Sequence, residues 1–132
     1  MIYQDEAEAN EACIKWQSRL RLADWIVKVK IAGHAEITQA LSGEPAMGCV
    51  HPVTHRKEAL VRLLDPKDWD AENKTFPQDH EVTLVHELLH LYFDMIYYAS
   101  PLGERSYEYK LAEEQAVCSL SSSIVALKRG ER

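Results

Sequence analysis

The sequence lacks the features that would direct it into a membrane, out of the cell or onto nucleic acid. No apolar run approaches the ~18 residues that a membrane-spanning helix needs. The first residues are acidic and lack the basic and apolar regions of a secretory signal. Basic residues are outnumbered, since 15 Lys and Arg stand against 21 Asp and Glu and give a formal net charge of -6. Binding along nucleic acid needs clustered Lys and Arg to neutralise phosphates, so we expect neither a nucleic-acid partner nor a membrane.

Cysteine is also scarce. Cys13, Cys49 and Cys118 are odd in number, far apart in the sequence and never part of a CxxC pair. They predict reduced thiols rather than a disulfide framework or a zinc ribbon, and they favour the cytoplasm as the location. The length of 132 residues predicts one compact domain over residues 1–132. The sequence pattern does not fix the oligomeric state.

Hydrophobic periodicity predicts an α+β domain. The expected elements are a helix over residues 5–22, strands over 25–31, 47–53 and 55–64, a helix over 82–98 and a helix over 106–128. Gly43 and Pro45 predict a turn or loop before the second strand. The strands are joined by connections too short for helical crossovers, so we expect a small antiparallel sheet of about three strands. Asp79 is the expected N-cap of the helix over 82–98. His80 beside it is expected to face water.

The helix over 82–98 carries the motif His86-Glu87-Leu88-Leu89-His90, which is an HExxH pattern. Residues four apart lie on the same helix face, so both imidazoles can reach one metal ion. Glu87 can reach a metal-bound water without binding the metal. Imidazole nitrogens suit Zn²⁺, which also tolerates the open coordination position that catalysis requires. We therefore predict a catalytic zinc site rather than an accidental motif.

The third zinc ligand is expected on the last helix. Its apolar stripe runs through Val117, Leu120, Ile124 and Leu127, and Glu113 occupies the first position of this stripe. A buried carboxylate is costly unless it is paired or metal-bound, which favours Glu113 as the ligand. Glu114, on a line with Cys118 and Ser121, is the alternative. Asp94, one turn beyond His90, is more naturally a residue that orients an imidazole or faces water.

Together these motifs resemble the gluzincin type of HExxH metallopeptidase. The resemblance rests on HExxH, a connection of 22 residues and an ExxA segment from Glu113 to Ala116. Within this type, the chain is similar to the minimal ImmA/IrrE-type and SprT-like domains, including short metallopeptidases carried by phages. The resemblance implies a zincin-like fold: an N-terminal helix, a small sheet, the HExxH helix and a C-terminal helix that carries the third ligand.

The resemblance also implies a mechanism. His86, His90 and Glu113 would hold Zn²⁺, and Glu87 would act as general base in the hydrolysis of a protein or peptide substrate. The substrate would add as a strand along the sheet edge, for which the Ala59–Leu64 strand is the expected edge. An additional oxyanion donor is left open among a set of polar residues: His51, His55, Tyr107 and Tyr109. The alternative is a zinc-binding interaction or regulatory module, of phage or mobile-element origin, that does not cleave peptides.

Overall fold

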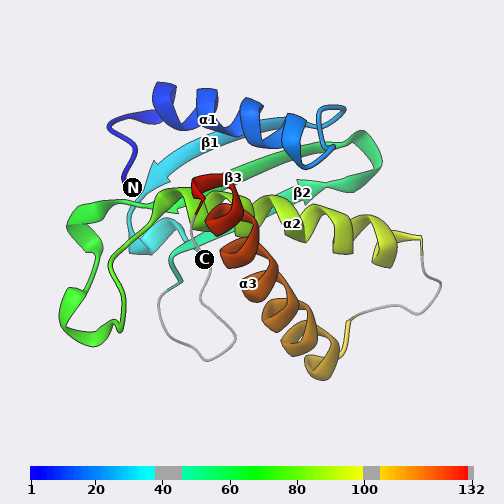
Figure 1. Cartoon of the computed structure of the whole chain (residues 1–132). Helices are drawn as coiled ribbons and strands as arrows, with labels where there is room; N and C mark the ends of the chain where they lie inside the picture. The colour runs from blue at the N-terminus through cyan, green and yellow to red at the C-terminus, as the bar shows by residue number, and fades with distance from the viewer. Residues whose placement is uncertain (38–45, 100–104, 131–132) are drawn as a thin grey trace.

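The computed structural model describes residues 1–37, 46–99 and 105–130, except for the side chain of Asn73. Gly43 and Pro45, where a loop was predicted, lie outside these ranges. The longer elements, in chain order, are α1 (Glu6–Arg19), β1 (Ile26–Ala32), β2 (Gly48–Val53), β3 (Glu58–Leu64), α2 (His80–Tyr98) and α3 (Tyr107–Arg129) (Figure 1). The α+β class is confirmed, with boundaries that differ from the expected ones by a few residues. No helix in these ranges has the length and apolar character needed to cross a bilayer.

The sheet has the strand order β1-β3-β2, and it is mixed rather than antiparallel. β2 and β3 form an antiparallel hairpin, whereas β1 pairs with β3 in parallel. The prediction of an all-antiparallel sheet was therefore wrong. It rested on connections too short for helical crossovers, which a parallel pair usually needs. In the structure β2 runs antiparallel to β1 but does not pair with it, because β3 lies between them. β3 reverses direction again after β2, so it pairs with β1 in parallel without a helical crossover.

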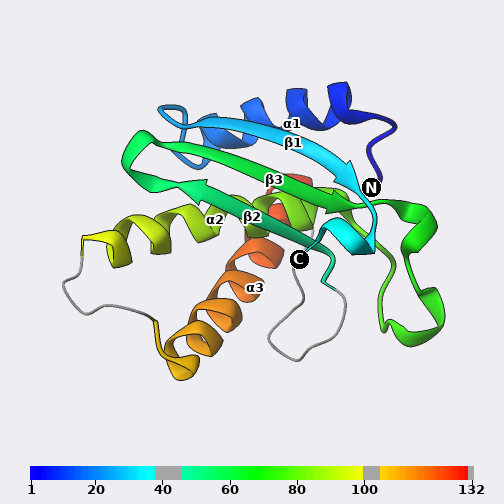
Figure 2. The same cartoon turned by 180° about the vertical axis from the view of Figure 1, so that it is seen from behind.

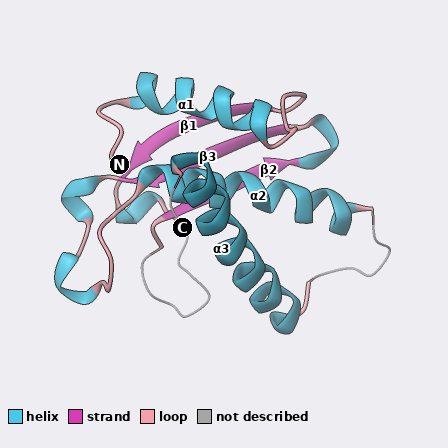
Figure 3. Ribbon diagram, in the orientation of Figure 1, coloured by secondary structure: helices cyan, strands magenta, loops and turns pink. Residues whose placement is uncertain are grey.

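The helices form one layer and the strands form the other (Figures 1 and 3). α1 contacts β1, while α2 contacts β2 and β3 and α3 packs on α2. The helix-facing positions of the central strand are Ala59, Val61 and Leu63, and all three are buried, as the alternation of β3 predicted. Leu84, Leu88 and Leu91 of α2 complete this core with no exposed surface. The core thus fixes α2 across the sheet, and the polar face of α2 is turned towards α3.

His80 is buried, although the sequence suggested that it faces water. Its side chain has no exposed surface, its Nδ1 accepts a hydrogen bond from the Tyr3 backbone N–H at 3.1 Å, and its Nε2 lies 2.9 Å from the Leu64 carbonyl oxygen. Its ring also stacks on that of Tyr3. The first turn of α2 lies against the end of β3 and the N-terminal segment, and this long-range contact is what buries the imidazole.

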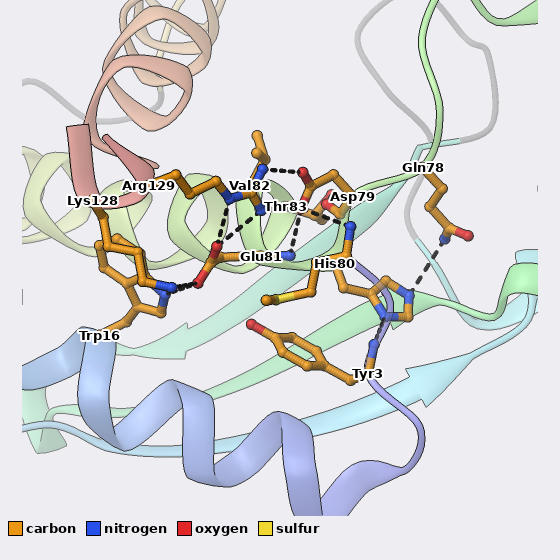
Figure 4. A network of polar contacts seen from close by, with 11 residues as sticks. Tyr3, Trp16, Gln78, Asp79, His80, Glu81, Val82, Thr83, Lys128 and Arg129 are labelled. Carbon is orange, nitrogen blue, oxygen red and sulfur yellow. Dashed lines mark hydrogen bonds and ion pairs between the residues drawn. The ribbon is translucent and has the colours of Figure 1, made fainter. Parts of the chain in front are cut away.

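A buried carboxylate joins the three helices near the start of α2 (Figure 4). Glu81 is 3% exposed, and its oxygens accept hydrogen bonds from Trp16 Nε1 at 3.1 Å, Lys128 Nζ at 2.9 Å and Arg129 Nε at 3.0 Å. Arg129 also binds the N-cap residue Asp79 at 2.8 Å. Each charge is paired, which offsets the cost of burying Glu81. These contacts fix the C-terminal end of α3 on the N-terminal end of α2.

This network predicts a loss of stability in acid. Burial alone would raise the pKa values of Glu81 and Asp79. Hydrogen bonds from Lys128, Trp16 and Arg129 lower the pKa of Glu81 below its ordinary value, and those from Arg129 and the Val82 N–H do the same for Asp79. The unfolded carboxyls therefore take up protons at a higher pH than the folded ones, so the stabilisation is complete above the unfolded pKa values and is lost as the pH falls below about 4.5. Urea unfolding between neutral pH and pH 3 measures this slope. A Glu81→Gln variant should show a shallower slope than the exposed control Glu11→Gln, and equal slopes would contradict the prediction.

Candidate metal centre

Helix α2 brings the two motif histidines together on its polar face. The Nε2 atoms of His86 and His90 lie 3.2 Å apart, and each side chain is 16% exposed. The spacing of four residues sets this proximity, because one turn of helix separates the two Cα atoms on the same face. The sequence predicted that the two imidazoles converge, and they do.

Glu87 lies behind this pair, between α2 and strand β2. It is 6% exposed, and its Oε1 is 3.8 Å from His86 Nε2. Gly48 of β2 packs closely against α2 here: a Cβ atom at this position would lie 2.6 Å from Thr83 Cγ2 and 3.7 Å from Glu87 Cγ. Glycine therefore permits the edge of the sheet to approach the helix beside the Glu87 side chain.

Helix α3 adds a carboxylate that faces both imidazoles. Glu114 Oε1 lies 2.8 Å from His86 Nε2, and Glu114 Oε2 lies 3.2 Å from His90 Nε2. In a tetrahedral zinc site with bonds of about 2.0–2.1 Å, neighbouring ligand atoms are roughly 3.3 Å apart. The two Nε2 atoms and the nearest Glu114 oxygen of each are thus spaced much as neighbouring ligand atoms of one zinc ion would be. The donor set of two imidazoles and one carboxylate fits Zn²⁺ as well.

Glu113 is buried, as predicted, but it faces the other nitrogen of His90. Its Oε2 lies 2.5 Å from His90 Nδ1, and its Oε1 accepts a hydrogen bond from Arg105 Nη1 at 3.2 Å. Arg105 also pairs with Asp94, and its guanidinium lies over the Tyr97 ring. A carboxylate on the Nδ1 side orients an imidazole whose Nε2 binds a metal. The prediction of Glu113 as a direct ligand stays a prediction, and the distances favour Glu114.

The reason for this difference lies in the packing of α3. Its buried positions are Glu113, Val117, Ser121 and Val125. Leu120 and Leu127, which were expected in the buried stripe, are 45% and 76% exposed. The apolar residues counted from the sequence therefore describe a face rotated away from the one that contacts α2. Glu114 lies on a line with Ser121, which is buried. The stripe expected from the sequence leaves this line out, which is why the sequence favours Glu113 over Glu114.

Comparison with protein-family models, with curated proteins and with solved structures gives no match. The resemblance to HExxH metallopeptidases stays a prediction. The side-chain geometry is thus the basis on which a function can be proposed.

Among the residues that the structure describes, two overlapping sets of side chains could hold a metal ion: His86, Glu87 and His90, and His86, Glu114 and Cys118. Cys118 Sγ is 3.8 Å from His86 Nδ1 and 3.8 Å from Glu114 Oε1. The thiol thus lies on the side of the His86 ring away from His90. His86 belongs to both sets, and His90 and Glu114, one from each set, both lie within 3.2 Å of its Nε2.

The electrostatics of the centre favour a cation. Burial would lower the pKa values of both imidazoles, but contacts with Cys118, Glu114 and Glu87 raise that of His86 to about 10, and Glu113 and Glu114 raise that of His90 to about 9. The same imidazoles hold the pKa of the Glu114 carboxyl far below its usual range. Burial raises the pKa of Glu87. Negative charge therefore outweighs positive charge around the imidazoles, so they retain protons that a metal ion would displace.

The residues left open as oxyanion donors lie in different environments. His51 of β2 pairs with Leu60 of β3, and its side chain lies on the face of the sheet away from the helices. His55 is exposed in a short turn between β2 and β3. Tyr107 is 59% exposed, and the Tyr109 ring packs on Tyr97 at 5.2 Å. The position of His51 argues against a role for it at the metal centre.

Proposed function

We propose that the chain is a zinc-dependent peptidase in which His86, His90 and Glu114 hold the metal ion and Glu87 is the general base. The observation that carries this proposal is the convergence of two Nε2 atoms and the Glu114 carboxylate within 3.2 Å of one another, with Glu87 buried beside them. Glu113 is given the role of orienting His90 through Nδ1. The Glu113 ligand inferred from the sequence remains the alternative assignment for the third position.

The zinc ion, when bound, would lower the pKa of a water molecule and polarise the substrate carbonyl. Glu87 is suited to take the proton from that water and pass it to the leaving amine. Its burial raises its pKa from the ordinary value, so it is a stronger base than an exposed carboxylate. Glu113 contacts His90 Nδ1, so His90 Nε2 would be available to hold the metal ion, and the ion pair with Arg105 keeps Glu113 in place.

Substrate binding along a sheet edge requires a different strand from the one expected. The Ala59–Leu64 strand is β3, which lies in the centre of the sheet, so that prediction was wrong. Strand β2 is an edge strand, and Gly48 brings it beside Glu87. The Leu64 N–H binds the Met47 carbonyl, so the antiparallel alternation directs the backbone groups of Gly48, Val50 and Pro52 away from β3.

These outward groups suit an extended peptide. The N–H and C=O groups of Gly48 and Val50 could pair with a substrate strand, which would then lie next to the metal centre. Pro52 has no N–H to donate, so such pairing would weaken beyond Val50. We therefore propose that a substrate peptide adds to β2 and that the Gly48 end of this strand is nearest the reacting bond.

The proposal is tested by incubating the zinc-loaded chain with an unfolded protein such as reduced, alkylated casein and identifying new termini by mass spectrometry. Cleavage is expected, it should stop with a zinc chelator, and it should return when zinc is restored. A His90→Ala variant prepared in parallel controls for contaminating proteases. A chain that binds zinc yet leaves every peptide intact would instead support a metal-binding regulatory module.

A further inference from the structure

The face of the sheet turned away from the helices is the second feature of interest. In Figure 2, seen from behind, the three strands lie in front of the helices. The strand register sets the side chains of this open face in rows, at alternate positions beginning with Ile26 in β1, Cys49 in β2 and Glu58 in β3. One end of the face is covered by a small cluster that includes Ile37. Helices α1 and α2 pack on the opposite face of the sheet.

This open face carries apolar side chains that a solvated sheet face would not need. Ile26 is 71% exposed and Val53 is 41% exposed, and the two flank Glu58 in one row. Leu60 occupies the centre of the next row. Together they border a shallow hollow of about 290 Å³. Ile26 and Val53 are exposed, Leu60 between them is half-buried, and the three lie together at a hollow rather than scattered singly, which favours an interaction surface.

Three basic residues lie beside the apolar centre. Lys28 and Lys30 project from β1, and Arg62 lies next to Lys30 on β3. Within residues 1–37, 46–99 and 105–130, no carboxylate pairs with any of these three side chains at ion-pair distance. The acidic member of the face, Glu58, pairs with Arg56 at 3.3 Å. An uncompensated positive patch thus lies on a chain whose formal net charge is -6.

We infer that this open face binds an acidic polypeptide segment that also carries apolar side chains. Carboxylates of the partner would meet Lys28, Lys30 and Arg62, while its apolar residues would cover Ile26, Leu60 and Val53. This arrangement of an apolar centre and a charged rim is that of a protein–protein interface. The inference concerns the side of the sheet opposite the metal centre, so it holds whether or not the chain is a peptidase.

The composition of the face favours a polypeptide over a nucleic acid. Single-stranded nucleic acids stack their bases on aromatic side chains, and the rows of this face contain none apart from the imidazole of His51. Three basic residues around an apolar hollow offer few phosphate contacts, and the overall negative charge opposes the approach of a polyanion. An acidic peptide with alternating apolar residues meets both parts of the surface.

Fluorescence anisotropy with a short labelled peptide that alternates Glu with Leu or Val tests the inference on the full chain. The affinity for this peptide should fall at least about tenfold in the Lys28→Glu/Arg62→Glu variant. The control variant, Lys15→Glu/Lys110→Glu, changes the net charge by the same amount at exposed positions on helices and should bind as the unchanged chain does. An Ile26→Ser variant should also weaken binding, because it removes apolar contact without changing charge.

Three results would overturn the inference. They are equal affinity in the two charge-reversal variants, no binding of the acidic peptide, and tighter binding of a single-stranded oligonucleotide than of the peptide at the same salt concentration. Amide chemical shifts mapped by NMR on the unchanged chain provide a check that needs no variant. Perturbations should centre on Lys28, Leu60 and Arg62, and perturbations confined to α3 would contradict the proposed surface.

Discussion

The Glu114→Ala variant is expected to lose its bound zinc, whereas Glu113→Ala should retain zinc with an affinity about 10–100-fold lower. Each Nε2 atom has a Glu114 oxygen within 3.2 Å, so the removal of Glu114 would delete the proposed third ligand. Glu113 contacts Nδ1 of His90, so its removal leaves the ligands present but one imidazole less well oriented. Metal content by mass spectrometry, on protein purified without added metal, and a competition titration measure the two effects.

The opposite order of effects would return the third position to Glu113. If Glu113→Ala alone lost its zinc, the half-exposed Glu114 would accept hydrogen bonds from the imidazoles but would not be a metal ligand. The His90→Ala variant sets the scale for the loss of a direct ligand in the same preparation. Thermal unfolding of each variant in excess chelator shows whether the fold itself is intact. This measurement distinguishes the loss of a metal ligand from a loss of packing between the helices.

Glu87→Gln is expected to keep its zinc and to lose peptide hydrolysis by roughly 10²–10⁴-fold, the range that general acid–base catalysis contributes. The amide has nearly the same shape as the carboxylate, so the packing of this side chain beside Gly48 of β2 is preserved. It cannot accept a proton from water. Turnover of a casein-derived peptide at matched zinc occupancy gives the ratio of rates between the variant and the unchanged chain.

Retention of full activity in Glu87→Gln would remove Glu87 as the general base. Loss of zinc together with activity would instead mean that Glu87 contributes to the metal site, as the set His86, Glu87 and His90 permits. An exposed replacement of the same kind, Glu11→Gln, controls for the change of charge. If a biological activity of the chain survived Glu87→Gln, the regulatory-module alternative would be favoured over the peptidase.

Local periodicity predicted those elements whose burial pattern follows from short-range spacing. The alternation of Ala59, Val61 and Leu63 gave the buried face of β3, and Asp79 gave the start of α2, where its side chain accepts from the N–H groups of Glu81 and Val82. These features depend on residues a few positions apart, so the sequence contains the whole cause. The pairing of β1 with β3 depends on residues more than 30 positions apart, and no local pattern carries that information.

The sequence by itself determined the HExxH pair, because a separation of four residues on one helix brings His86 and His90 to the same face in any fold that forms that helix. It also determined that a carboxylate at the start of the last helix is buried. Only the tertiary structure decided how each of the two neighbouring carboxylates is used. The rotation of α3 on α2 turns Glu114 towards both Nε2 atoms and Glu113 towards Nδ1, and that rotation is set by which side chains fill the contact between the helices.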